Sequence, residues 1–241
     1  MLGLTERQIR ILKLIVEEFI NTGEAVGSET LDKKYNLEVS PATIRNEMVV
    51  LAQQGFLSKN HSSAGRLPTH QALKLYIHEL MKEKILSVVD EVDLKEKIWS
   101  CRPNFDQMMI ETVKILAQKS QVLSLVLTEE SRLYHSGYAN LLQMKEFCDI
   151  RLMKQVLSLT EEIGALNDIF GLVQNEDIVK VVYGKELGNK GLEPVSVVYI
   201  IINNKKHLVK IALFGSNRFD YSYVFPMMKY FHNLMSEALG E

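Results

Sequence analysis

The dipeptide Ser40-Pro41 limits the fold of this chain more than any other feature, because it marks where a helix begins. A serine side chain at the N-cap accepts a hydrogen bond from a free backbone amide, and proline at the first helical position sacrifices no amide hydrogen bond. The segment that follows, PATIRNEMVVLAQQ, places Ile44, Met48 and Leu51 on one face and stops at Gly55. The sequence therefore predicts a helix from residue 41 that is buried along one side.

Two further helices precede this one. Thr5 and Gln8 have the spacing of a capping box, which predicts a helix over about residues 6–21. A shorter helix is predicted in SETLDKKYN, with Ser28 as its cap. Three short helices, the last two joined by a tight connection, indicate a helix-turn-helix arrangement.

The early exposed positions of the third helix are candidates for reading a DNA sequence. Thr43, Arg45 and Asn46 lie off its apolar face, within the first two turns. Recognition helices meet base edges with their N-terminal residues, where arginine pairs with guanine and asparagine with adenine. The alternative is an ordinary solvated helix face, which the helical pattern alone leaves open.

The segment after the third helix favours the DNA-binding interpretation. FLSK, residues 56–59, is typical of a short strand, and HSSAGRLPTH, residues 61–70, is a polar loop before a helix predicted over about 69–84. This order predicts a winged helix, in which the wing contacts the DNA backbone or the minor groove. The wing residues predicted to do so are Lys59, His61, Ser62, Ser63 and Arg66, and Ser40 is predicted to hold a phosphate at the start of its helix.

The local charge supports the same placement. The whole chain of 241 residues has a net charge of −2, so any positive field must be local. Residues 40–78 carry a balance of +3, whereas residues 1–39 carry −2. The positive charge therefore falls on the predicted recognition helix and wing, where phosphate contacts are needed.

The second half is predicted to be a separate α+β domain. Residues 86–104 are mixed in character, so they are taken as a linker between a domain at 1–85 and another at 105–241. The elements predicted there are a helix to about Ser120, a strand VLSLVLT, helices over 140–170, a strand IVKVVYG, a hairpin of 195–202 and 207–214, and a helix over 226–239. The hairpin strands are almost continuously apolar, which indicates burial on both faces or a subunit contact.

Composition narrows the class of protein. With 46% hydrophobic and 24% charged residues the chain is ordinary globular material. Cys101 and Cys148 fit neither a disulfide framework nor a zinc spacing, so two reduced, buried thiols are expected. No apolar run reaches the roughly 18 residues that span a bilayer, and the charged, amphipathic start is unlike a secretory signal. A cytoplasmic protein is expected.

No constellation of residues indicates an enzyme, a cofactor or a metal. GKELGNKG, residues 184–191, lacks the spacing of a phosphate-binding loop and is better interpreted as a flexible loop. His61, His70 and His78 have no carboxylate or thiolate at ligand spacing. Neither a nucleophile elbow nor a nucleophile with an identifiable base is present.

Arg218, Asp220 and Tyr221 allow two interpretations. They could form the edge of a ligand pocket, or a turn held by an Arg–Asp pair with the tyrosine packed inside. The turn is the favoured interpretation.

Two signatures in the first 76 residues resemble a known family. SPATIRNEM and HSSAGRLPT, within an almost gapless match from Leu4 to about Tyr76, resemble the N-terminal domain of the heat-inducible transcription repressors of the HrcA family. SVVYIIINNKKHLVKIALFGSNRFDYSYVFPMMKYFHNLMSEAL is more loosely similar to the family's terminal hairpin and closing helix. The resemblance implies a repressor of chaperone operons that binds an inverted-repeat operator, a GAF-like C-terminal domain, and a chaperonin that helps to keep the repressor active.

The chain departs from the family pattern between SLVLTEES and YHSGYANLL, which only a few residues separate. Family members usually have more of the sheet there, and an inserted subdomain associated with dimerisation. The chain therefore resembles an abbreviated member.

Two functions from different classes are predicted. The leading one is a sequence-specific repressor that binds duplex DNA as a homodimer. The alternative is a protein-interaction module, in which the winged helix is a docking surface and the GAF-like domain binds a partner or ligand.

Overall fold

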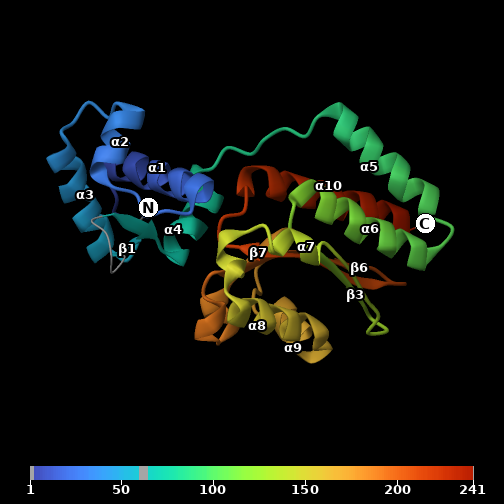
Figure 1. The fold of residues 1–241 in the computed structure, drawn as a ribbon. Helices are drawn as coiled ribbons and strands as arrows, with labels where there is room; N and C mark the ends of the chain where they lie inside the picture. The colour runs from blue at the N-terminus through green and yellow to red at the C-terminus, as the bar shows by residue number, and fades with distance from the viewer. Residues whose placement is uncertain (1–2, 60–64, 241) are drawn as a thin grey trace. The chain divides into compact units, whose positions relative to one another are not determined.

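The computed structural model describes residues 3–59 and 65–240, which form two compact units. The first unit is Met1–Lys82 with Asp220–Ser222, and the second is Glu83–Phe219 with Tyr223–Glu241 (Figure 1). Among the described residues, no helix has both the length and the apolar character needed to cross a bilayer.

Three helices, a small hairpin and a further short helix with a π-helical turn build the first unit. Its elements are α1 (Glu6–Thr22), α2 (Ser28–Tyr35), α3 (Pro41–Gln53), β1 (Leu57–Lys59), β2 (Arg66–Pro68), α4 (His70–Leu75) and the π-helical turn η1 (Tyr76–Leu80). The two strands pair antiparallel. The apolar faces of the three helices meet in one core, in which Ile11, Leu12, Ile15, Leu31, Ile44 and Leu51 are fully buried.

The predicted start signals of α1 and α3 are confirmed. Thr5 and Gln8 form the reciprocal capping box, and the Ser40 side chain accepts from the Thr43 amide with Pro41 in the first turn. The predicted cap of α2 is wrong. Gly27 occupies the N-cap position in an extended conformation, and Ser28 is the first helical residue with its side chain buried.

The helix predicted over 69–84 is shorter than expected. Thr69 caps α4, and the helical path ends at Leu80, where the Met81 backbone becomes extended. The next residues bury no apolar side chain that would stabilise a longer helix. Lys82, Glu83 and Lys84 are exposed, and Ile85 is 97% exposed. A helix without an apolar face gains little from tertiary packing.

The second unit is an α+β domain around one antiparallel sheet. Its strands are β3 (Leu123–Thr128), β4 (Leu133–Ser136), β5 (Lys180–Tyr183), β6 (Val195–Asn203) and β7 (Leu208–Ser216), in the order β4-β3-β7-β6-β5. Its helices and turns are α5 (Val88–Cys101), α6 (Phe105–Ser120), α7 (Tyr138–Leu141), η2 (Lys145–Cys148), α8 (Ile150–Glu161), α9 (Ile163–Gly171), η3 (Gly184–Leu187), η4 (Lys190–Leu192) and α10 (Tyr221–Gly240).

Helices cover both faces of this sheet. Figure 1 shows α6 and α10 on one face and α8 and α9 on the other. Alternate residues of β6 and β7, such as Val197 and Phe214, join the core beneath α8 and α9. The predicted burial of the β6–β7 hairpin on both faces is therefore confirmed, and helices of the same chain supply it.

Three elements and the two cysteines differ from the sequence-based expectation. Residues 86–104, expected to be a linker, contain α5, whose Leu94 and Ile98 are buried. Strand β4 was not predicted, and it follows β3 at the point where the family pattern is interrupted. Helix α10 begins at Tyr221 and includes Pro226, because Val224 and Phe225 are buried and extend its packed face. Cys148 is exposed and Cys101 partly exposed, so the expected burial of both thiols is wrong.

Candidate nucleic-acid interface

The first two turns of α3 present polar side chains outward. Ser40 caps the helix at 3.2 Å from the Thr43 amide, and the hydroxyl groups of the two residues lie 3.0 Å apart. Arg45 and Asn46 are exposed, whereas Ile44 between Thr43 and Arg45 is fully buried. The buried side of the helix thus sets which residues face outward.

Glu47, the one acidic residue of α3, is directed back onto α1. Its carboxylate accepts a hydrogen bond from the Gln8 side chain at 2.9 Å and pairs with Arg7 at 3.5 Å. These contacts join the start of α1 to α3 and offset the negative charge beside Arg45. Sequence reasoning missed them, because the partners lie about 40 residues apart and no local pattern links them.

The β1–β2 hairpin brings two cations together. Lys59 is exposed and pairs in register with Arg66 across the strands. Arg66 is also held by two backbone hydrogen bonds with Val26, each 2.9 Å, which add a third extended segment to the hairpin. Its guanidinium donates to the Gly65 carbonyl oxygen at 3.3 Å and is partly buried. Of the other predicted wing residues, His61, Ser62 and Ser63 lie outside the described residues.

Residue 65 must be glycine because it lies very close to Ala25 of the same unit. A side-chain carbon at this position would lie 2.9 Å from the backbone of Ala25. The chain can therefore pair Arg66 with Val26 only if residue 65 has no Cβ. Lys59 and Arg66 therefore form the last paired position of the two strands before the loop, next to the segment between α1 and α2.

A buried carboxylate fixes α2 on α1. Glu18 of α1 is 5% exposed, and it accepts from Lys34 at 2.5 Å and from the Tyr35 hydroxyl at 2.8 Å. The hydrogen bond from Lys34, against the cost of burial, holds the pKa of Glu18 below its ordinary value of 4.5. Burial, together with the bond to Glu18, raises the pKa of Tyr35 to about 12.

The contacts of Glu18 predict that the first unit loses stability in acid. The folded-state pKa of Glu18 lies below the ordinary 4.5, so its contribution to the free energy of unfolding is present above that pH. The contribution is lost as the pH falls through the folded-state pKa. Glu18→Gln should lower the free energy of unfolding by about 1.5 kcal/mol at neutral pH, since Lys34 is half exposed. The difference from wild type should shrink towards zero in acid.

Urea unfolding at a series of pH values measures this effect. The exposed Glu38→Gln is the matched control and should follow wild type throughout. A constant deficit of Glu18→Gln at every pH would contradict the linkage.

Comparison with known proteins identifies the family. A family model described as "HrcA protein C terminal domain" matches residues 38–225, which is more than half of the chain. The chain belongs to the HrcA family. The match covers α3, the hairpin and most of the second unit, and it confirms the resemblance seen in SPATIRNEM and HSSAGRLPT.

Curated HrcA relatives align over different lengths. "Heat-inducible transcription repressor HrcA" of Clostridium perfringens (strain SM101 / Type A) is 30% identical over 205 residues, which is 81% of this chain and 58% of the relative. The protein of the same name from Clostridium botulinum (strain Eklund 17B / Type B) is 41% identical over 119 residues, 49% of this chain and 33% of the relative. The chain therefore spans between a third and three-fifths of the length of these relatives.

A solved structure shares the fold. The protein described as "Crystal structure of a hypothetical protein at 2.2 A resolution" superimposes with a TM-score of 0.76 over 98% of each chain. Its sequence identity is 19%, so the likeness concerns the fold alone.

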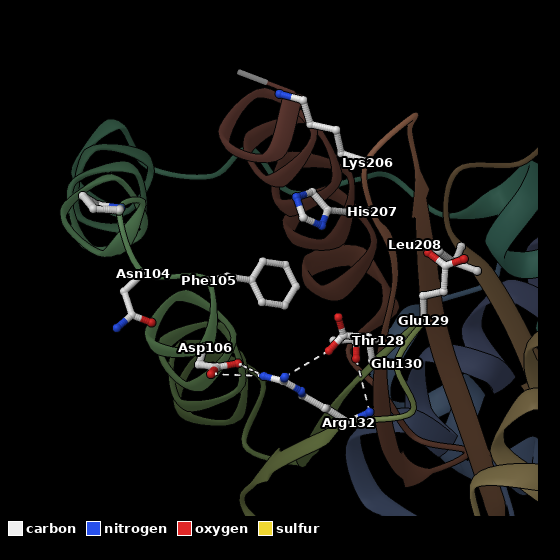
Figure 2. Close-up of a pocket in the computed structure, with 11 residues that line it drawn as sticks. Asn104, Phe105, Asp106, Thr128, Glu129, Glu130, Arg132, Lys206, His207 and Leu208 are labelled. Atoms are coloured by element: carbon white, nitrogen blue, oxygen red, sulfur yellow. Dashed lines mark hydrogen bonds and ion pairs between the residues drawn. The ribbon is translucent and has the colours of Figure 1, made fainter.

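The second unit of this HrcA-family chain has a pocket of about 480 Å³ (Figure 2). It lies between the start of α6, the β3–β4 turn and the β6–β7 turn. Phe105 stacks on His207 with 5.0 Å between ring centroids. Asp106 pairs with Arg132 at 3.0 Å, and Arg132 pairs with Glu130 at 3.0 Å. Asp106, Glu130 and Arg132 thus pair with one another, and Glu129 and Lys206 are the other charged residues of the lining.

The remaining sequence-based candidates have structural explanations. Among the described residues no cluster of His, Cys, Asp or Glu could hold a metal. Residues 184–191, interpreted as a loop, contain the 3-10 turn η3 and the start of η4, and the Tyr183 amide donates to Glu186 at 3.0 Å. Arg218 pairs with Glu146 at 2.5 and 3.0 Å and so joins the turn after β7 to η2. The turn interpretation expected Asp220 to pair with Arg218, and the carboxylate described on Arg218 is that of Glu146. The full burial of Tyr221 agrees with the interpretation.

Proposed function

We propose that the first unit is a winged helix-turn-helix domain that binds duplex DNA and that the chain acts as a transcriptional repressor. The order of three helices, a two-stranded hairpin and a further helix supports the winged-helix assignment, with α3 as recognition helix and β1–β2 as wing. The name shared by the HrcA relatives, "Heat-inducible transcription repressor", supports the repressor role, and heat-shock operons are its proposed targets. The five-stranded antiparallel sheet supports a GAF-like second domain.

One observation carries the proposal. Arg45 and Asn46 project from the start of α3, while Glu47, the acid that would repel phosphate, is held by Arg7 and Gln8. The exposed surface of α3 is therefore cationic and carries the donors and acceptors that suit base edges. Thr43, Arg45 and Asn46 would enter the major groove.

The other predicted residues would position the helix on the backbone. Ser40 and the adjoining amides at the start of α3 suit one phosphate. Lys59 and Arg66, together with His61, Ser62 and Ser63, would contact backbone or the minor groove. We also propose a homodimer on an inverted repeat in the cytoplasm, with a chaperonin as regulatory partner.

Arginine and lysine substitutions separate base reading from phosphate binding. Arg45→Ala should cost about 1–3 kcal/mol of binding free energy on the operator and relax preference at one base pair. Lys59→Ala should weaken operator and random DNA alike and lower the salt slope by about 1. Fluorescence-anisotropy titrations on both duplexes, at several salt concentrations, measure the two effects.

The exposed Lys154→Ala on α8 removes a cation outside the proposed interface and should leave both affinities unchanged. Equal losses for Arg45→Ala on operator and random DNA would refute the groove assignment. Selection of bound duplexes from a random pool supplies the operator, and a palindrome is the expected result.

The alternative function is a protein-interaction module whose second domain binds a ligand. The pocket beside Phe105 and His207 is the observation that favours it. Salt titration separates the two functions, because a docking module would show no steep salt-dependent binding to duplex DNA.

A further inference from the structure

An apolar surface lies exposed at the start of the second unit. Ile85 is 97% exposed, Val88 74%, Val89 79% and Val92 58%. Nine large apolar side chains are strongly exposed among the described residues, and these four fall within eight consecutive positions. We call them the α5 stripe. Such a concentration of exposed apolar surface marks an interaction site more often than scattered single residues do.

The opposite face of α5 is firmly attached to its own unit. Leu94 and Ile98 are buried, and α5 packs on α6. The Tyr230 hydroxyl of α10 donates to the Glu91 carbonyl oxygen at 2.8 Å, and Lys119 of α6 forms an ion pair with Asp90. These contacts set the rotation of α5 about its axis. With 3.6 residues per turn, Val88 and Val92 then lie on the side away from Leu94 and Ile98.

We propose that the α5 stripe is where two copies of this chain pair, α5 against α5, antiparallel about a two-fold axis near Val92. A second copy is the occupant that the charges of α5 favour. The α5 stripe would be the interface of the homodimer proposed above. Only the role of that dimer on DNA rests on the proposed function.

The charge order along α5 makes the helix complementary to itself in the antiparallel direction. The acids Asp90, Glu91 and Asp93 lie in its first half, and the second half holds Lys95, Glu96 and Lys97, so the first half is the more acidic. In an antiparallel pair centred on Val92, Glu91 of each copy meets Lys95 of the other on the same flank of the stripe. The dipoles of two antiparallel helices also point in opposite directions, which is electrostatically favourable.

The size of the stripe indicates a modest affinity. A helix of 14 residues is about 21 Å long, and one helix face offers less than the roughly 800 Å² per partner of a standard interface. We therefore expect a reversible dimer with a dissociation constant on the order of micromolar. When two copies bind the two halves of an inverted repeat, the DNA raises the effective concentration of each copy near the other, which favours the dimer.

Charge reversal with mixing tests the proposal on the full-length chain. Sedimentation velocity without DNA should show wild type shifting from monomer to dimer over micromolar concentrations. Glu91→Lys and Lys95→Glu should each weaken self-association roughly tenfold or more, because each brings like charges together twice. An equimolar mixture of the two variants should recover a dimer, since every contact then joins opposite charges.

Val92→Arg and Lys154→Glu complete the set. Val92→Arg should abolish the dimer without changing the circular-dichroism spectrum or melting temperature, because Val92 is exposed. Lys154→Glu, on α8, should behave as wild type. A wild type that stays monomeric, a dimer unaffected by Val92→Arg, or a mixture that fails to recover would each overturn the proposal. Binding to a single half-site is measured separately, so failure of DNA recognition remains distinguishable from failure of pairing.

Discussion

Ile44→Ala is expected to remove about 2–5 kcal/mol from the free energy of unfolding of the first unit. Ile44 is fully buried between the exposed residues of α3, so truncation loses apolar contacts and leaves a cavity where α3 meets the core of the unit. Because native domains are stable by only about 5–15 kcal/mol, this loss is a large share of the total. Urea unfolding followed by far-UV circular dichroism measures it.

Val49→Ala is the matched control on the same helix. Val49 is 39% exposed, and alanine has the higher helix propensity, so its stability should stay within about 0.5 kcal/mol of wild type. Where Ile44→Ala unfolds the unit, DNA affinity should fall on all sequences together, in contrast to Arg45→Ala. A loss below about 1 kcal/mol for Ile44→Ala would mean that α3 is not packed as described.

Gly184→Ala is expected to destabilise the second unit by more than about 3 kcal/mol, through overpacking that the backbone cannot relieve. A Cβ at this position would lie 1.5 Å from the carbonyl oxygen of Leu192, so the turn from β5 into η3 would have to open. Gly184 is buried, and the clash is with backbone, which cannot rotate aside as a side chain can. Chemical denaturation and the yield of soluble protein both report the effect.

Gly164→Ala provides the comparison. Gly164 lies in α9, where an added Cβ would meet no atom within 4 Å. Alanine there should raise stability by about 0.5–1 kcal/mol through helix propensity. If Gly184→Ala were as stable as Gly164→Ala, the close approach of residues 184 and 192 would be disproved.

Residues near one another in the sequence carried the signals that were interpreted correctly. The capping box of Thr5 and Gln8, the Ser40-Pro41 start and the apolar runs of β6 and β7 each act over one turn or one strand. Ser28 shows the limit of that reasoning. Gly27 and Ser28 both suit an N-cap, and the burial of Ser28 decided that Gly27 takes the position.

Segments distant in the sequence determined the remaining features. Residues 86–104 look like a linker until Leu94 and Ile98 find α6 to pack on. Strand β4 is short and only half apolar, so it depends on pairing with β3. The same holds for Arg218, whose partner Glu146 lies 72 residues away.

The sequence by itself determined where most helices and strands begin, which face of α3 is buried and which family the signatures indicate. Only the tertiary structure decided that Glu47 turns to Gln8, that Arg66 is anchored on Val26 and that α5 exposes its valines. The physical reason is the distance along the sequence over which each interaction acts. Caps and periodicity depend on hydrogen bonds and side chains within about four residues. Ion pairs and exposed faces depend on which distant surfaces the core brings together.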